Sequence, residues 1–586
     1  EPFPVVCRKY EDCQLEILEP SVKTVPCGNA GSGTSVSTPP QGISADLVDA
    51  GFGTAKDYER LTEVGVDPNG KIALIERSDR LTFEPYIACR LASDLGIRAV
   101  VFATFFSEHT AFRKDAFPSA LIPAVSIPYK EAQQLRDKMR KQKVRIRLKN
   151  IVEIEENGIS CNVIGDLVGV EYPEEVVTIT AHHDSWFEGA NDNASGVALV
   201  LETARLLKKS YKPKRTLRFI SFGAEESGSE NFFEWAVGSF HYVNKQGGEI
   251  KNIVANVNLD APCYGDMVAV RATPEMTTFV KEIIRDLDLE TIFKVLDMPT
   301  SWTDHWSFVM AGVPSVNFGS YSRTAYEKIY HTNYDVPLNV SYLLIAPVSE
   351  VLLALVKGLD SAEVLPYDFI PTAERLEREL ASRKAKLKGT VNVSKALEKT
   401  RRLKVLARKF NRLKEKHLRG AGLNIDIKVA NRLQLETCSL LNRSMIGTGG
   451  GTNKEAAWII SEHLDMLVMM KKAVKALQRK NLRQTIAALS SLRTMDWGLN
   501  VNLNTYNETF DLMLKRNRYP GIYINAMTEL LSLKGKLKKE NADVSIELSS
   551  IKEKHEKTVR EVRKKISSQE VAITKSSKNL MQAISE

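Results

Sequence analysis

The stretch AHHDSWFEGANDNASG, at residues 181–196, constrains this chain more than any other part of it. It follows VVTIT (residues 176–180), whose β-branched side chains predict a buried strand, and it leads into the helical pattern SGVALVLETARLL. His182, Asp184 and Asp192 therefore lie where a buried strand ends, which is where open α/β sheets hold their ligands. Nitrogen and oxygen donors of this kind suit zinc. On this stretch alone, a polar turn with a hydrogen-bonded histidine explains the pattern equally well.

Three later segments repeat the arrangement of a predicted strand followed by metal-type donors. Residues 215–228 (RTLRFISFGAEESG) and 252–261 (NIVANVNLDA) each predict a strand that ends in carboxylates, and residues 311–318 (AGVPSVNF) predict a strand that leads to YHT. Chance can place acids after one or two strands, but four strand ends in succession, with a histidine at both ends of the series, indicate a metal site. The donors delivered by these strand ends are His182 with Asp192, Glu226, Asp260 and His331.

These segments resemble the co-catalytic dinuclear zinc peptidase family, which includes secreted aminopeptidases, glutamate carboxypeptidase and the non-catalytic transferrin receptor. The matching motifs are AHHDS, GANDNASG, AEESG, NLD, WTDHWSF and YHT, in the family's order, and the resemblance covers residues 44–360. DSW followed by KPKRT and EWAVGS resembles the branch of glutamate carboxypeptidase and the transferrin receptor. One departure is SENFFEW, at residues 229–235, which is longer than in the simplest members and is expected at the pocket rim.

The resemblance implies two zinc ions and a division of the donors between them. Asp192 is expected to bridge the ions, His182 and Asp260 to complete one, and Glu226 and His331 to complete the other. Three carboxylates against two divalent ions leave about one positive charge, which favours hydroxide over water at the bridge.

The catalytic roles combine local geometry with the resemblance. Glu225 and Glu226 are adjacent and cannot face the same way on an extended segment, so Glu225 can act as general base on the zinc-bridging water while Glu226 binds metal. By resemblance, Tyr330 hydrogen-bonds the developing oxyanion and Asp184 orients His182. Packing remains the alternative for Tyr330, and solvated loop acids remain the alternative for the glutamates.

Five neighbouring residues receive weaker assignments. Strand alternation turns His183 away from the ligands. Asp304 and His305, in WTDHWSF, are expected to support loop structure. Trp186 and Phe187 either line the pocket mouth or pack in the core.

The predicted fold is α/β: a mixed-sheet zinc exopeptidase domain with helices on both faces, an inserted β-rich protease-associated domain and an all-helical C-terminal domain. The inserted domain follows from resemblance and is expected to shape substrate access. In the resembled branch, the helical domain forms a homodimer. The expected divisions are an N-terminal segment at residues 1–43, the protease-associated domain at 44–150, the catalytic domain at 151–360 and the helical domain at 361–586.

Charge is distributed unevenly along the chain. The net charge is +9, yet residues 361–586 hold 44 Lys and Arg against 24 Asp and Glu, whereas the remainder holds 37 against 48. The two parts should therefore attract each other. The basic residues of 361–586 interleave with Leu, Ile and Val at helical spacing, which favours exposed helix faces over nucleic-acid binding.

Cysteine usage and targeting signals leave the compartment open. Cys7, Cys13 and Cys27 cluster near the start, which allows a disulfide without requiring one. Zinc binding through cysteine is not expected because no CxxC pair occurs, and free thiols are expected for the seven cysteines. No apolar run approaches the length of a membrane span, and EPFPVVCRKYEDC has no signal-peptide pattern.

The leading functional hypothesis is a metallo-exopeptidase, specifically an aminopeptidase. The pocket arginines of glutamate carboxypeptidases follow a GVP-type turn, but here residues 315–318 read SVNF and the next arginine is Arg323. A carboxypeptidase needs a cation for the terminal carboxylate, whereas an aminopeptidase needs acids for the amine. The alternatives are a carboxypeptidase or dipeptidase of the glutamate carboxypeptidase type and a transferrin-receptor-like binding protein. A single-zinc enzyme resembling glutaminyl cyclase fits poorly with the inserted domain and helical tail.

Overall fold

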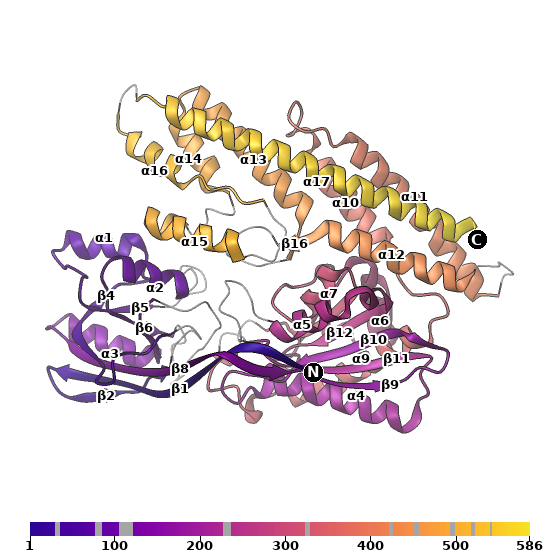
Figure 1. Cartoon of the computed structure of the whole chain (residues 1–586), viewed down its shortest axis with the longest axis horizontal. Coiled ribbons are helices and arrows are strands. Elements are labelled where there is room, and N and C mark those ends of the chain that lie inside the picture. Colours follow the sequence, from indigo (N-terminus) through magenta and orange to yellow (C-terminus); the bar gives the residue numbers. More distant parts are fainter. Residues whose placement is uncertain are drawn as a thin grey trace.

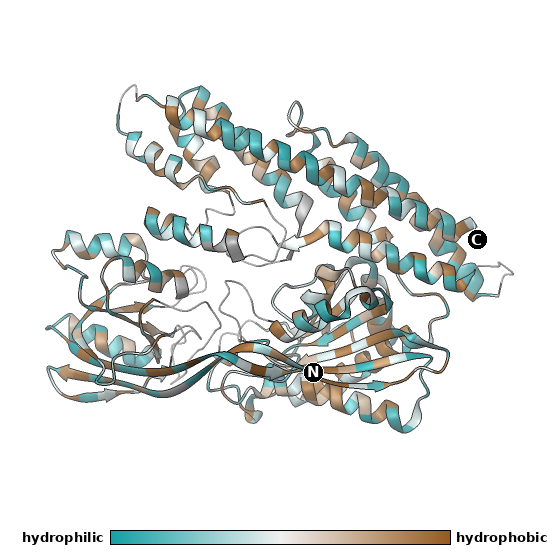
Figure 2. Cartoon of the chain, in the orientation of Figure 1, coloured by the Kyte–Doolittle hydropathy of each residue, from teal (hydrophilic) through white to brown (hydrophobic). Residues whose placement is uncertain are grey.

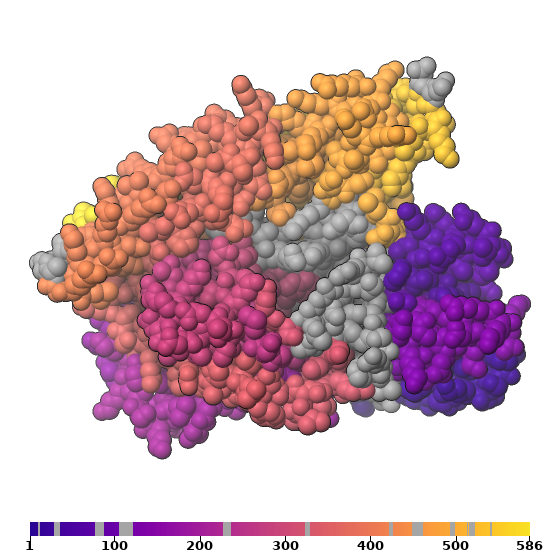
Figure 3. All heavy atoms as spheres, turned by 180° about the vertical axis from the view of Figure 1, so that it is seen from behind, coloured from indigo at the N-terminus to yellow at the C-terminus, as the bar shows by residue number. Residues whose placement is uncertain are grey.

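The computed structural model in Figure 1 arranges the chain in three parts. We call residues 1–161 the N-terminal lobe, residues 162–361 the central part and residues 362–585 the helical part. Seen from behind, the helical part extends above both of the others (Figure 3). The structure describes residues 1–29, 35–76, 85–104, 121–226, 236–322, 328–420, 426–448, 456–492, 498–516, 522–539 and 542–585.

The central part is built on a seven-stranded mixed sheet with the order β14-β13-β15-β12-β10-β11-β9. Strands β11, β10, β12 and β15 run parallel, β9 is antiparallel to β11, and β13 is antiparallel to β15. Every residue of β12 is buried, as expected for a strand covered on both faces. The mixed sheet predicted from the sequence is confirmed. Its strands are β9 (Val163–Leu167), β10 (Tyr172–His182), β11 (Arg215–Phe222), β12 (Ile253–Leu259), β13 (Val268–Ala272), β14 (Phe293–Leu296) and β15 (Ser315–Ser320).

Helices cover both faces of this sheet. Figure 1 shows α4 on one face and α5 with α7 on the other, and Figure 2 shows that the strands between them are rich in apolar residues. Helix α9 packs against α4, α6 and strands β10 to β12. These helices are α4 (Gly196–Ser210), α5 (Val237–Gln246), α6 (Thr277–Asp286), α7 (His305–Ala311) and α9 (Ile345–Ser361).

The segment Tyr342–Ser361, which contains α9, is apolar and long enough to cross a membrane, with a hydropathy of 1.8, and it is the one such segment in the described residues. Its contacts with the sheet account for this composition. Near its end, the buried carboxylate of Asp360 accepts hydrogen bonds from the Tyr211 hydroxyl at 2.6 Å and from the backbone N–H groups of Lys214 at 3.1 Å and Arg215 at 2.7 Å. Helix α9 is therefore hydrogen-bonded to the start of β11 and forms part of the core.

The N-terminal lobe contains an eight-stranded sheet with the order β2-β1-β8-β4-β5-β6-β7-β3. Strands β4 to β7 are parallel, and the strands at both ends of the sheet pair antiparallel. The strands are β1 (Pro2–Glu19), β2 (Lys23–Val25), β3 (Gly28–Asn29), β4 (Ile43–Asp49), β5 (Ile72–Glu76), β6 (Ala99–Ala103), β7 (Ala124–Ile127) and β8 (Arg145–Cys161), with helices α1 (Ala55–Glu63), α2 (Pro85–Asp94) and α3 (Tyr129–Met139).

Strands β1 and β8 form a long ribbon that joins the lobe to the central part (Figure 1). At one end Phe3 and Val5 pack with Ala224 of the central part, and at the other end Leu15 and Ile17 lie in the core of the lobe. The N-terminal segment expected at residues 1–43 thus contributes strands to the lobe's sheet.

The alternating residues of 144–172 predict antiparallel strands that lead into the catalytic sheet, and the structure has antiparallel strands there. They form β8, which pairs with β1, and β9, which pairs with β11. Alternation predicts a strand but not its partner. The partner of β8 is set by the core, where Leu15 lies opposite Leu148 and Ile17 opposite Ile146, all four buried.

The helical part is a bundle in which the 41-residue helix α17 packs against α11, α12 and α13. The outward surface of α17 is polar (Figure 2). The all-helical prediction is confirmed apart from a short hairpin of β16 (Ile446–Thr448) and β17 (Ala456–Trp458). The helices are α10 (Ile370–Lys384), α11 (Ser394–Leu418), α12 (Ile427–Met445), α13 (Ile459–Gln478), α14 (Leu482–Ser490), α15 (Leu503–Arg516), α16 (Met527–Lys536) and α17 (Ser545–Ser585).

The helical part touches both other parts through polar contacts. Helix α15 packs against α2, where Glu508 pairs with Arg90. On the central part, Arg375 lies 3.3 Å from Asp297, and the Asn442 amide donates to Glu275 Oε1 at 2.7 Å. The Arg375 pair has the signs that the overall charges predict, and the Arg90 pair has the opposite signs. Net charge therefore does not determine the individual ion pairs at these contacts.

Arg215, at the start of β11, is fully buried and holds several elements together. Its Nε donates to Glu175 at 2.7 Å. Its Nη1 donates to the carbonyls of Leu359 at 3.2 Å, Asp360 at 2.7 Å and Ala362 at 2.8 Å. One guanidinium thus ties the sheet to the end of α9 and to the start of the helical part.

We expect Arg215→Met to destabilise the central part by about 3–5 kcal/mol, because it leaves the Glu175 carboxylate without its buried partner. Urea unfolding followed by tryptophan fluorescence measures the loss. The matched control is Arg205→Met, which removes an exposed arginine that pairs with Glu202 one helical turn away and should change little. Equal midpoints for the two variants would contradict this account of Arg215.

Candidate metal centre and active site

The five predicted ligands meet at the carboxyl edge of the central sheet. His182 is the last residue of β10, Asp260 directly follows β12, and Glu226 lies shortly after β11. Since these three strands are parallel neighbours, their ends lie together. Asp192 comes from the turn before α4, and His331 comes from the loop after β15.

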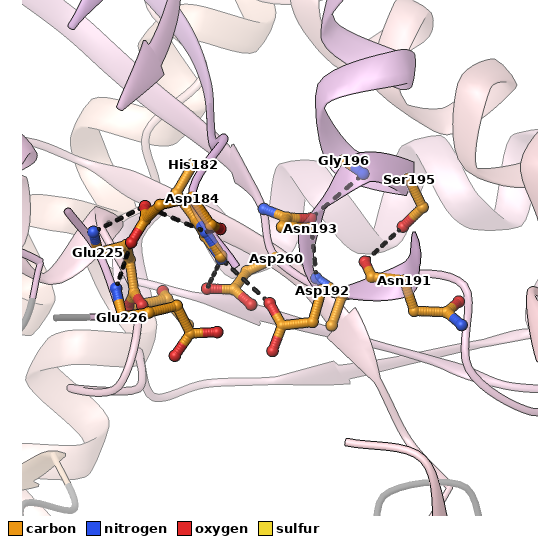
Figure 4. A network of polar contacts seen from close by, with 12 residues as sticks. His182, Asp184, Asn191, Asp192, Asn193, Ser195, Gly196, Glu225, Glu226 and Asp260 are labelled. Atoms are coloured by element: carbon orange, nitrogen blue, oxygen red, sulfur yellow. Dashed lines mark hydrogen bonds and ion pairs between the residues drawn. The ribbon is translucent and has the colours of Figure 1, made fainter. Parts of the chain in front are cut away.

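Asp192 lies at the centre of the group. Its Oδ1 is 3.1 Å from His182 Nε2, and its Oδ2 is 3.3 Å from His331 Nε2. Asp260 Oδ2 lies 3.8 Å from the same nitrogen of His182, and Glu226 Oε2 lies 3.0 Å from that of His331. The predicted ligands therefore fall into two groups that share Asp192, and the carboxylates of Asp192, Asp260 and Glu226 face a common space (Figure 4).

The histidines and Asp192 stabilise each other's charged forms. Burial raises the pKa of Asp192, but hydrogen bonds from His182 and His331 outweigh burial and hold it below its ordinary value. Burial lowers the pKa of His182, but its interactions with the carboxylates of Asp192 and Asp260 hold it well above its ordinary value. These interactions would be replaced by ligand bonds if a cation occupied the shared space.

For the remaining carboxyl groups, burial outweighs the opposing effect of the histidines on the pKa. Burial raises the pKa of Glu226 to about 7, although His331 opposes the shift. Burial also raises the pKa of Glu225 and of Asp260 above their ordinary values. Glu225 Oε1 and Glu226 Oε1 are buried, and neither has a hydrogen-bond partner in the described part of the chain. Buried polar atoms are normally satisfied, so oxygens left open in this way fit a site built for metal cations.

The orientation of His182 also fits metal binding. Its Nδ1 lies 2.9 Å from the backbone oxygen of Asp184, and since a carbonyl only accepts, Nδ1 carries the hydrogen. The Nε2 lone pair is then left for a metal when the ring is neutral. Imidazole and carboxylate donors together suit zinc.

Asp184 acts differently from the sequence-based expectation. Its backbone oxygen, rather than its carboxylate, makes the short contact to His182, because the carboxylate is 3.8 Å from Nδ1. The carboxylate instead accepts the backbone N–H groups of Glu225 at 2.9 Å and Glu226 at 3.0 Å (Figure 4). Asp184 thus holds the end of β10 against the segment that follows β11.

Asp335 is a supporting residue to which the sequence assigns no role. Its carboxylate accepts the backbone N–H groups of Asn191 at 2.8 Å and Asp192 at 3.0 Å, and the Tyr264 hydroxyl at 3.0 Å. It therefore fixes the backbone that carries the central ligand. The signal that could have identified it is its position in YHTNYD, four residues after His331.

Asn193 is a second supporting residue to which the sequence assigns no role, although it lies next to Asp192 in the motif. Its amide donates to the Leu259 carbonyl at 2.8 Å, and its oxygen accepts the N–H groups of Gly196 and Ala261, each at 3.2 Å (Figure 4). A Cβ on Gly196 would lie 2.3 Å from that oxygen, so the glycine is required by the close approach. The side chain fastens the Asp192 loop to the end of β12.

Three further residues to which the sequence gives weaker assignments lie near the site. His183 is exposed, and its Nδ1 lies 3.1 Å from the Ser221 hydroxyl. His305 is buried and contacts Thr303, as a loop-supporting residue should. Asp304 is buried, which raises its pKa to about 7. The charge of His182 lowers this pKa, and the charge of Asp260 raises it. Asp304 therefore adds to the negative charge around the site.

Two aromatic residues adjoin His331. The ring of Tyr330 stacks on the His331 ring with centroids 3.6 Å apart, and its role toward an oxyanion stays a prediction. The buried Trp186 meets His331 edge-on at 6.5 Å, which places it beside the ligands. The expected rim segment 229–235 and Arg323 lie outside the described residues.

Comparison with known proteins agrees with this geometry. Residues 162–356 match the model of peptidase family M28. The matched stretch contains all five predicted ligands. The motif-based resemblance to this metallopeptidase family is thereby confirmed.

Three similar proteins extend the comparison. Aminopeptidase YwaD of Bacillus subtilis is 32% identical over 52% of this chain and 64% of its own length, and carboxypeptidase Q of Xenopus laevis is 28% identical over 54% and 67%. The chain thus spans about two thirds of each of these relatives. The crystal structure of a peptidase M28 precursor from Shewanella amazonensis has a TM-score of 0.51 with 21% identity, covering 62% of this chain and 84% of that one, and it supports the fold.

We expect metal affinity to increase as the pH rises from about 6 to 8, because bound carboxylates and imidazoles must be deprotonated. In the metal-free protein, burial raises the pKa of Glu226 to about 7 and that of Asp260 above its ordinary value, and the pKa of His182 is also raised. A competition titration of the metal-free protein with a chromogenic zinc chelator measures the dissociation constant at each pH. An affinity that stays constant or falls over this range would contradict the assignment.

We expect Asp335→Asn to weaken metal binding about 10- to 100-fold without unfolding the protein, because the amide nitrogen cannot accept the hydrogen bonds that one carboxylate oxygen of Asp335 accepts. The same chelator titration reads this effect, and circular dichroism checks the fold. The matched control is Asp266→Asn, which changes an exposed aspartate in the same way. Equal affinities in the two variants would refute the role given to Asp335.

Proposed function

We propose that this chain is a dinuclear zinc exopeptidase that removes residues from the N-terminus of peptides. The observation that carries the proposal is the convergence of two histidines and three carboxylates around Asp192, with Glu225 beside them, in an M28 domain. His182 and Asp260 would hold one ion, Glu226 and His331 the other, and Asp192 both. Two zinc ions held there would supply Lewis acidity and a water of lowered pKa.

Glu225 is the proton carrier in this proposal. Its carboxyl is buried, burial raises its pKa, and the bonds from Asp184 to the backbone of Glu225 and Glu226 fix the segment that carries it. A carboxylate whose pKa is raised is a stronger base toward the proton of a water molecule. Glu225 thus takes the proton of the attacking water and delivers it to the leaving amine.

Tyr330 and Asp184 complete the catalytic set. Tyr330 donates its hydroxyl hydrogen to the oxygen of the scissile carbonyl as negative charge develops there. Stacking on His331 supports this role by restricting the tyrosine ring. Asp184 acts as a positioning residue for His182 through its backbone oxygen and for Glu225 through its carboxylate.

The charges around the site favour a substrate's amino terminus. The largest electrostatic influences on Glu225, Glu226, Asp260 and Asp304 come from other carboxylates and from histidines. Residues 315–318, where glutamate carboxypeptidases carry pocket arginines, form the buried strand β15. An acidic site attracts a free α-ammonium group and repels a terminal carboxylate.

The other parts of the chain have accessory roles in this proposal. The divisions at 1–43, 44–150, 151–360 and 361–586 separate an N-terminal segment, a protease-associated domain that shapes access, the catalytic domain and a dimerisation domain. Exposed apolar side chains on α11 and α17, such as Val405 and Val571, support a homodimer through the helical part. Light scattering of the purified chain decides between dimer and monomer.

We expect Glu225→Gln to lower kcat by about 10²- to 10⁴-fold while zinc content and KM for aminoacyl-p-nitroanilides stay close to wild type, because it removes only the proton acceptor. The control is Glu188→Gln, which changes an exposed glutamate in the same loop region as Asp184 and should leave kcat unchanged. A Glu225→Gln enzyme with wild-type kcat would refute the role of Glu225.

A peptide library with free and blocked ends tests which terminus is cut. Mass spectrometry should show stepwise shortening from the free N-terminus and no cleavage of N-acetylated peptides. Shortening from the C-terminus would favour the carboxypeptidase alternative. Zinc-loaded protein that shortens neither end would favour a binding protein.

A further inference from the structure

Cys13 and Cys27 face each other across an antiparallel hairpin in the N-terminal lobe. Strands β1 and β2 pair in the register Leu15↔Val25, Glu16↔Thr24 and Ile17↔Lys23. Extending this register by one alternation places Cys13 opposite Cys27, on the same face as Leu15 and Val25. The two Sγ atoms are 3.0 Å apart. Directly opposed residues of an antiparallel pair have the separation that a disulfide needs.

The surroundings of this pair differ from those of the other cysteines. Cys13 and Cys27 are half-buried at the edge of the lobe's core, so both thiols are held in place yet remain close to solvent. Cys89, Cys263 and Cys438 are buried in other places, and burial raises the pKa of each. All seven cysteines lie in the described residues, and Cys13 and Cys27 are the pair whose sulfur atoms are in contact.

We propose that Cys13 and Cys27 form a disulfide bond when the protein meets a disulfide oxidant such as oxidised glutathione. The thiolate of one cysteine attacks the oxidant, forms a mixed disulfide and releases one glutathione thiolate. The second cysteine thiolate then attacks the protein sulfur of the mixed disulfide and releases the second glutathione. The two cysteines lose two electrons and two protons in total, and the oxidant is reduced to two thiols.

The disulfide would lie where the β1–β8 ribbon leaves the core of the N-terminal lobe. Residue 13 is on β1 between the buried core residue Leu15 and the register shift at Tyr10/Asp12, beyond which the β1–β8 ribbon continues to the central part. At the far end of that ribbon, Phe3 and Val5 pack on Ala224, the neighbour of Glu225. A cross-link from Cys13 to Cys27 would therefore fix β1 in the N-terminal lobe. The other end of the same strand reaches the proposed catalytic segment.

The direct test maps thiols in the full chain. The purified protein is equilibrated in a glutathione buffer at about −200 mV, denatured, alkylated and digested without reduction. Mass spectrometry should find Cys13 and Cys27 in one linked peptide, with Cys7 and Cys161 alkylated. Alkylation of Cys13 and Cys27, or a link from either to another cysteine, would overturn the proposal.

Unfolding provides a second readout, which does not depend on peptidase activity. Reductant should lower the unfolding temperature of the oxidised wild-type protein, because a disulfide restricts the unfolded chain. The unfolding temperature of the Cys13→Ser/Cys27→Ser variant should not respond to reductant, whereas that of Cys7→Ser should respond as wild type does. An equal response in wild type and the double variant would refute the cross-link.

Discussion

The structure of the site depends on the concentration of negative charge around Asp192. Four carboxylates, Asp192, Glu225, Glu226 and Asp260, are packed around two imidazoles in a largely buried space. Buried carboxylates are costly unless protons or cations neutralise them, and the raised pKa values of Glu225, Glu226 and Asp260 are the consequence when only histidines are present. The same side chains become good ligands once divalent cations supply the missing charge.

Holding such a cluster in place requires bonds that compete with its internal repulsion. None of the carboxylate ligands lies within a strand, so their positions are set by side chains that bond the neighbouring backbone. Asp184 holds the segment after β11, Asp335 holds the loop before α4, and Asn193 ties that loop to β12. Each of these residues bonds backbone from a different strand end. The rigid sheet therefore supplies the common edge, and three polar side chains fix the loops on it.

The convergence of the proposed ligand side chains could be predicted from the sequence because the information is local. A buried strand that ends in His or Asp can be read from a few residues, and the motifs at His182, Glu226 and Asp260 carry it. The contacts that cannot be predicted from the sequence link distant positions. The Asp335 carboxylate accepts a hydrogen bond from the Asp192 backbone, and β8 pairs with β1, with Leu148 opposite Leu15. Nothing in the alternation of β8 specifies which strand lies beside it. The helical part was predictable as helices, whereas its ion pairs with the other parts follow from packing rather than from net charge.

The most direct test of the account is a crystal structure of the protein grown with zinc, with anomalous diffraction recorded on both sides of the zinc absorption edge. The account predicts two anomalous peaks, one beside His182 and Asp260 and one beside Glu226 and His331, with Asp192 in contact with both. A single peak, peaks away from these residues, or the five side chains turned away from a common space would contradict it.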